Sequence, residues 1–183
     1  MATDPAPRRH VALQWCLPAL ALLSPCRAAA QQSEHADYGN FGIDAIVVIA
    51  TGVIVCAAAL LHYEVLSVLS RWLARREGQR RRRVLLAIFG VLSVHIAEIW
   101  IFGLGYAVLL LAPAFGTVAG IGNDILDLVY LSAMTFTTVG APDAHLSGTI
   151  RFLNGTEALT GLVLITWSAS FTFLEMERFW RDR

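Results

Sequence analysis

The run LSAMTFTTVGAPD, residues 131–143, lies between two long apolar segments and decides the fold that the sequence predicts. Its first half is typical of a short helix. Its second half is built from Thr, Val and Gly, which is typical of extended backbone whose carbonyl oxygens can be turned towards one axis. Converging carbonyl oxygens are what a cation-selective filter uses to replace the hydration shell of an ion. The run therefore predicts a short helix followed by a cation-binding loop.

The composition favours one all-α membrane domain. The 183-residue chain is 56% hydrophobic and only 15% charged, so no large soluble domain is expected beside the apolar segments. Its 14 basic and 14 acidic residues cancel, and the net charge therefore gives no basis for binding nucleic acid. The expected environment is the lipid bilayer.

Residues 1–30 are predicted to be a signal peptide. A basic start, an apolar run over residues 11–23 and small residues at 28–30 are typical of a segment cleaved by signal peptidase. The alternative is a retained first membrane helix, which would be short. Both interpretations export residues 31–40, so the topology predicted for the rest of the chain is the same.

Three further segments are predicted to cross the membrane, at about residues 43–61, 84–112 and 152–174. Residues 65–73 have apolar side chains at helical spacing among arginines, which predicts an amphipathic extension of the first span in the cytoplasmic interface. His62 and Glu64 are expected at the same interface.

Arginines predict the topology of the spans. Seven of them fall within thirteen residues between the first and second spans: Arg71, Arg75, Arg76, Arg80, Arg81, Arg82 and Arg83. The positive-inside rule places this loop in the cytoplasm. Anchoring of the loop is the preferred role, and specific binding of anionic lipid is the alternative. The segment between the second and third spans is then expected to enter from the outside.

The helix predicted over residues 125–136 is too short to cross a bilayer. Irregular backbone at membrane depth is tolerated only where it is buried in protein or lines water. The sequence therefore predicts an all-α membrane protein with three transmembrane helices, a re-entrant helix and a filter loop. Its parts are residues 31–83, which hold the exported N-terminus, first span and basic loop, and residues 84–183, which hold the pore domain.

The sequence TTVG at 137–140, placed after a short apolar helix and followed by an aspartate, resembles the pore loop of the potassium channel superfamily, in particular small bacterial channels with two transmembrane helices. The resemblance covers residues 84–180. It implies a homotetramer that passively conducts monovalent cations. The residues that it implies for the ion filter are Thr137, Thr138, Val139, Gly140, Ala141, Pro142 and Asp143.

The same resemblance implies the position of a hinge and the cellular location. Residues 157–161 are similar to the opening of the inner helix in these channels, with Gly161 as a candidate gating hinge. The expected location is the inner membrane, with the loop facing the exterior or periplasm. The resemblance implies no enzymatic activity, no cofactor and no resident metal, and Ser168 and Ser170 have no base in the sequence pattern that would make them nucleophiles.

The chain departs from the family pattern after Gly140, where Ala141 and Pro142 replace the usual Tyr and Gly. That second glycine serves because it accepts a positive φ, whereas proline is fixed near a φ of about −65°. The missing tyrosine also removes aromatic packing behind the loop, and the apolar Met134 offers no carboxyl partner to Asp143. We expect the inner half of the filter to be preserved and its outer half to be altered.

His95 and Glu98 lie near the middle of the second span, three residues apart and so on one helix face. An intramembrane carboxylate is expected to face protein or water. The pair either contributes to a metal or proton site or bonds to the short helix behind the filter. The second interpretation is preferred, because two ligands do not make a metal site and no third His or Cys has a compatible place. The alternative to a channel is a non-conducting or metal-handling protein of the same fold that uses His95 and Glu98.

Overall fold

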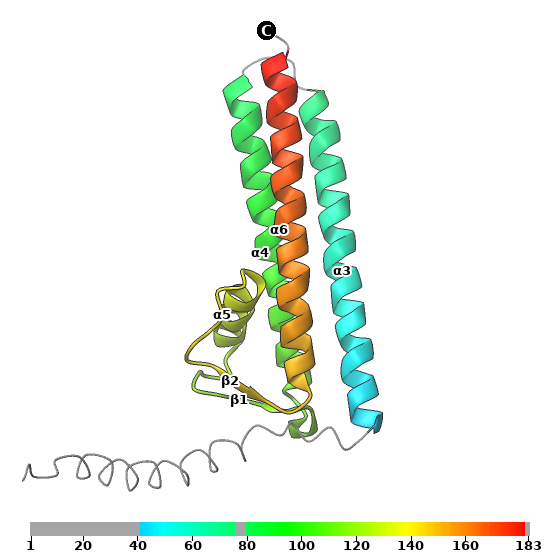
Figure 1. The fold of residues 1–183 in the computed structure, drawn as a ribbon, viewed down its shortest axis with the longest axis vertical. Helices are drawn as coiled ribbons and strands as arrows, with labels where there is room; N and C mark the ends of the chain where they lie inside the picture. Colours follow the sequence, from blue (N-terminus) through cyan, green and yellow to red (C-terminus); the bar gives the residue numbers. More distant parts are fainter. Residues whose placement is uncertain (1–40, 76–79, 182–183) are drawn as a thin grey trace, which may run out of the picture. The chain divides into compact units, whose positions relative to one another are not determined.

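The computed structural model describes residues 41–75 and 80–181 (Figure 1). The predicted signal peptide and exported segment lie outside these ranges. Within them the helices are α3 (Phe41–Ala74), α4 (Arg80–Leu109), α5 (Ile125–Phe136) and α6 (Ile150–Arg181), with a 3₁₀ turn, η1 (Pro113–Phe115), and two strands, β1 (Thr117–Ala119) and β2 (His145–Ser147).

Three of these helices are long and apolar enough to cross a membrane, over Phe41–Ala74, Arg82–Leu109 and Ile150–Glu177. None contains a proline, and Pro113 follows shortly after the end of α4. The shortest of these stretches has 28 residues, about 42 Å at 1.5 Å per residue, which exceeds the roughly 30 Å of a hydrocarbon core. The structure confirms a mostly helical protein with three helices that could span a membrane. It joins the predicted first span and its amphipathic extension into one continuous helix.

The three long helices lie side by side, with α4 antiparallel to α3 and α6 in contact with both (Figure 1). The short helix α5 packs against α4 and α6. Its bounds agree with the prediction, and Asp124 is its N-cap residue, although the Asp124 side chain makes no capping hydrogen bond. The main core lies where these helices meet, and includes Phe102, Tyr106, Leu128, Leu131, Phe136 and Leu153.

Two glycines allow α5 to approach its neighbours closely. A Cβ atom at Gly103 of α4 would lie 2.8 Å from the Val129 side chain. A Cβ atom at Gly161 of α6 would overlap the carbonyl oxygen of Phe136, at the end of α5. Gly161, predicted as a hinge, lies within the continuous helix α6 and has a packing role that the sequence alone does not reveal.

The end of α5 lies deep along the bundle. The Phe136 carbonyl meets Gly161, eleven residues into α6, and the Phe136 ring lies 5.8 Å from that of His95, fourteen residues before the end of α4. At 1.5 Å per residue these positions are about 16 and 21 Å from the helix ends. The strands β1 and β2 pair antiparallel, with Thr117 opposite Ser147, and join the segments before and after α5. The sequence does not predict these strands, because three residues are too few to show alternation.

Candidate functional site

The loop after α5 begins with exposed residues. Thr137 to Gly140 are all exposed, and Val139 has 69% of its surface accessible. Thr138 and Gly140 have left-handed φ angles of 60° and 79°, on either side of Val139, whereas Thr137 has a φ of −80°. Alternation of backbone hand is what lets successive carbonyl oxygens face one side. The backbone of residues 137–140 thus alternates in hand.

Thr138 is a strained residue. It is the only non-glycine residue with a positive φ in the described ranges, and its branched Cβ makes that conformation especially unfavourable. Such a conformation costs on the order of 1–3 kcal/mol and persists only where its surroundings enforce it. Here the Thr138 amide donates to the Thr135 carbonyl at 2.8 Å, and the Gly140 amide donates to the Met134 carbonyl at 2.9 Å. The end of α5 therefore holds the loop in this shape.

The second half of the loop has a different backbone conformation. Gly140 is the last residue of this loop with a positive φ, and the φ angles of Ala141 and Pro142 are not positive. A cavity of about 320 Å³ lies behind the turn, lined by Thr138, Gly140 and Ala141 together with residues of α5, the following loop and α6. The Asp143 carboxylate has no carboxyl partner and instead accepts a long hydrogen bond of 3.4 Å from the Tyr130 hydroxyl.

Glu157 of α6 connects three helices behind the loop. Its buried carboxyl group accepts a hydrogen bond of 2.6 Å from the Tyr106 hydroxyl of α4 and lies 2.5 Å from the Ser132 hydroxyl of α5. Asn154 donates to the Tyr106 oxygen at 3.1 Å and to the Thr135 hydroxyl at 2.8 Å. The Glu157 network, comprising Tyr106, Ser132, Thr135, Asn154 and Glu157, supplies the polar bonds to α5 that the sequence analysis assigned to His95 and Glu98.

The hydrogen-bond partners of Ser132 are consistent with a neutral carboxylic acid at Glu157. The Ser132 oxygen lies 2.5 Å from Glu157 and 2.9 Å from the Ile99 carbonyl oxygen, yet a hydroxyl group has one proton to donate. If Glu157 donates to Ser132, then Ser132 donates to Ile99, and the second Glu157 oxygen accepts from Tyr106. Every group in that arrangement is satisfied, which suits the interior of a membrane protein.

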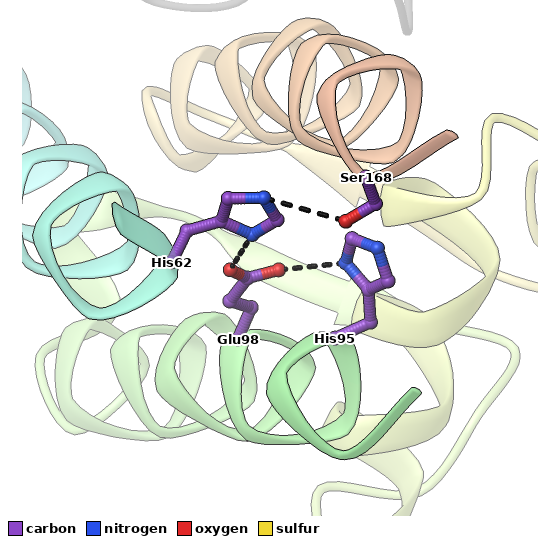
Figure 2. Close-up of polar contacts among 4 residues, drawn as sticks. All are labelled: His62, His95, Glu98 and Ser168. Carbon is purple, nitrogen blue, oxygen red and sulfur yellow. Dashed lines mark hydrogen bonds and ion pairs between the residues drawn. The ribbon is translucent and has the colours of Figure 1, made fainter. Parts of the chain in front are cut away.

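A second buried cluster joins α3 to α4 (Figure 2). Glu98 is fully buried, and its two carboxylate oxygens lie 2.7 Å from the Nδ1 atom of His62 and 2.8 Å from the Nδ1 atom of His95. The Ser168 hydroxyl of α6 lies 3.3 Å from the Nε2 atom of His62. The His62 and Glu98 side chains are 0% exposed, and that of His95 is 14% exposed. These four residues are called the His–Glu cluster below.

This geometry corrects one expectation. The sequence analysis found no third His or Cys in a compatible place, yet ligand atoms of His62, His95 and Glu98 lie within 4.8 Å of one another. His62 lies 21 residues from the start of α3, and its side chain is fully buried. Ala58 and Leu66 precede and follow His62 by four residues and are buried too, so helical spacing was the signal that could have assigned His62 to an inner face.

The predicted site residues thus occupy two separate places. The residues predicted for the filter lie in the loop after α5, and His95 and Glu98 join His62 in a buried cluster beside Phe136.

Comparison of the sequence with family models, with curated proteins and with solved structures finds no match. What can be inferred of the protein's function therefore comes from these two places.

Proposed function

We propose that this chain is the subunit of a passive cation channel, in which four copies surround one pore. The observation that carries the proposal is the backbone of Thr138–Gly140, left-handed at both ends and exposed, held at the end of a helix of 12 residues. Carbonyl oxygens presented in this way can replace the water shell of a cation.

The depth of α5 supports the proposal. A 12-residue helix spans about 18 Å, too little to cross a bilayer, and its end lies about 16 Å along α6 from the start of that helix. Between two membrane-spanning helices, such a segment enters and returns on one side. Polar backbone at that depth requires water or protein around it. A loop that lines a water-filled pore meets this requirement.

The exposure of the loop supports an oligomer. In the single chain, residues Thr137–Gly140 are all exposed, and Val139 among them is 69% exposed. A ring of ion ligands needs carbonyl oxygens from several directions, which closed symmetry of identical chains supplies. The arginines after α3 orient the subunit in an inner membrane, with the loop on the outer side.

Flux measurements with the purified full-length protein in liposomes test the proposal. We expect uptake of potassium and rubidium, and of sodium where the altered outer half relaxes selectivity. Replacing Ala141-Pro142 with Tyr-Gly is expected to raise the preference for potassium over sodium, because glycine can adopt the left-handed backbone and tyrosine can fill the cavity behind Ala141. Absence of flux for all three ions would contradict the channel, and an unchanged preference would contradict the explanation for the outer half.

Two alanine variants form a matched pair for the loop itself. A Cβ atom at Gly140 or at Gly155 would meet nothing within 4 Å, but Gly140 has a φ of +79° whereas Gly155 is helical. A left-handed alanine costs about 1–2 kcal/mol. Gly140→Ala is therefore expected to reduce flux by about 5- to 30-fold, and Gly155→Ala is expected to leave it unchanged. Equal flux in the two variants would separate conduction from the shape of this loop.

A further inference from the structure

We propose that His62, His95 and Glu98 bind a divalent cation of the zinc class, and that this cation fastens α3 to α4. The proposal rests on the His–Glu cluster alone and holds whether or not the chain conducts ions.

Convergence of three ligand groups is the first argument. His62 comes from α3, and His95 and Glu98 come from one face of α4, yet their ligand atoms lie within 4.8 Å of one another (Figure 2). Helices rather than loops carry all three side chains, so their positions are defined by backbone packing. Two imidazoles and one carboxylate are a ligand set that zinc takes when it keeps one position open.

The donor atoms select the class of cation. Imidazole nitrogen is a good ligand for zinc, cobalt and nickel, whereas calcium and magnesium prefer sites made of oxygen ligands. Of the three proposed ligands, only Glu98 supplies oxygen. A monovalent cation passing through the proposed pore would also find too few oxygen ligands here. The cluster is therefore distinct in chemistry from the filter loop.

The cluster is close to the dimensions that a bound cation needs. Ligands about 2.0–2.1 Å from a tetrahedral metal lie about 3.3 Å from each other. The two carboxylate–imidazole distances, to different oxygens of Glu98, are 2.7 and 2.8 Å, and all three ligand atoms lie within 4.8 Å of one another. Binding therefore requires the close pairs to separate by roughly 0.5 Å and the widest pair to approach by up to about 1.5 Å. The terminal torsion of a glutamate and the ring torsion of a histidine are both broad, so rotation of the side chains can make these adjustments.

Ser168 gives His62 the partner that a metal-bound imidazole requires. A ligating histidine donates its other ring N–H to a neighbouring oxygen, which sets its tautomer. Without metal, Nδ1–H of His62 donates to Glu98 and Nε2 accepts from the Ser168 hydroxyl. With metal on Nδ1, the proton resides on Nε2 and is donated to the Ser168 oxygen, 3.3 Å away. The serine hydroxyl serves both states because it donates and accepts.

The experiment measures metal binding to the full-length protein, purified in detergent with a tag that contains no histidine and stripped with a chelator. Zinc or cobalt is added, unbound metal is removed, and bound metal is measured by elemental analysis. We expect about one cation per chain, and for cobalt the visible absorption typical of tetrahedral coordination. No bound metal in the wild-type protein, or binding equal in wild type and Glu98→Gln, would overturn the proposal in favour of a purely hydrogen-bonded cluster.

Three variants grade the response. Glu98→Gln keeps the size of the side chain but removes the anionic ligand. Its affinity for zinc is expected to fall by more than about 100-fold, which exceeds the loss typical of removing a residue that only hydrogen-bonds to a metal ligand. Ser168→Ala removes only the partner of His62 and is expected to lose about 10–100-fold. His145→Ala is the control, since His145 is exposed on β2 and away from the cluster. Elution as the same oligomer shows that each variant is folded.

A failed channel and a failed metal site give different results. Metal retention is measured without flux, and ion flux is measured in the presence of a chelator. If the protein retains metal but passes no ion, the metal-site proposal stands and the channel proposal fails. If it conducts ions but retains no metal, the channel proposal stands and the metal-site proposal fails.

Discussion

The loop over residues 137–143 and the two buried polar clusters behind it solve opposite problems. In the loop, residues Thr137–Gly140 are exposed, and the backbone is held in a strained conformation at Thr138. In the Glu157 network and the His–Glu cluster the polar groups are side chains, which are buried and hydrogen-bonded within one chain. The clusters are therefore complete within one chain, whereas the loop leaves exposed the residues that the proposed oligomer would surround.

Gly161 lies where the two kinds of region meet, and its substitution is expected to have the largest effect. In Gly161→Ala the new Cβ atom would overlap the Phe136 carbonyl oxygen, and it would lie 2.8 Å from the carbonyl carbon. Because these are backbone atoms, α5 must move away from α6. We expect a loss of at least about 3 kcal/mol in stability, at the upper end for overpacked cores, measured as a lower unfolding temperature in detergent.

Gly155→Ala is the control in the same helix, because a Cβ atom at Gly155 would contact nothing within 4 Å. Alanine is favoured over glycine in a helix by about 1 kcal/mol, so this variant is expected to be as stable as the wild type or slightly more stable. Similar destabilisation of both variants would mean that flexibility of α6, rather than contact with α5, requires glycine. That result would restore the hinge as the main role of Gly161.

Glu157 tests the buried side of the comparison, with an intermediate effect. Glu157→Leu fills the space but leaves the Tyr106 hydroxyl without its acceptor, which costs about 1–3 kcal/mol. Glu157→Gln is expected to stay within about 0.5 kcal/mol of the wild type, because its amide can accept from Tyr106 and donate to Ser132 and so keeps both bonds of the carboxyl group. Thermal unfolding of both variants in detergent gives the ranking. Equal destabilisation by Leu and Gln would show that the carboxyl group itself is required.

Infrared spectroscopy tests the proton on Glu157 separately. A neutral carboxylic acid gives a carbonyl band that an ionised carboxylate lacks, and that band is expected to disappear in Glu157→Gln. If the difference spectrum instead shows loss of carboxylate bands, the proton count at Ser132 is wrong and the network holds a buried charge.

The sequence predicted the exposed region better than the buried ones. The bounds of α5 follow from an apolar run that begins after Asp124 and ends at the Thr-rich loop. Pro142, which cannot adopt a positive φ, explains why the left-handed residues of the loop end at Gly140. These are local properties of neighbouring residues. The loop could therefore be described from its own sequence, except for the strain at Thr138, which depends on hydrogen bonds from the end of α5.

The buried clusters depend on the rotation and register of long helices, which the sequence does not specify. Helices that are apolar on most sides show no single inner face. His62 and Glu98 are separated by 36 residues, and Tyr106 and Glu157 by 51, so no local pattern pairs them. Glu157 could have been marked as a candidate, since a carboxylate within a predicted span is unusual. Its partners could not, because they depend on how α5 packs between α4 and α6.

Thr138 offers the smallest effect and the sharpest separation of stability from function. Glycine adopts a φ of +60° without strain, so Thr138→Gly is expected to raise stability by about 1 kcal/mol. The neighbouring Thr137 has an ordinary φ of −80° and its hydroxyl donates to the Ala133 carbonyl at 2.7 Å, so Thr137→Gly is expected to lower stability instead. If Thr138→Gly is more stable and also conducts less selectively, the strain serves ion binding. If it is more stable with unchanged flux and selectivity, the strained backbone has no part in conduction. The contrast between the strained loop and the hydrogen-bonded clusters would then concern stability alone.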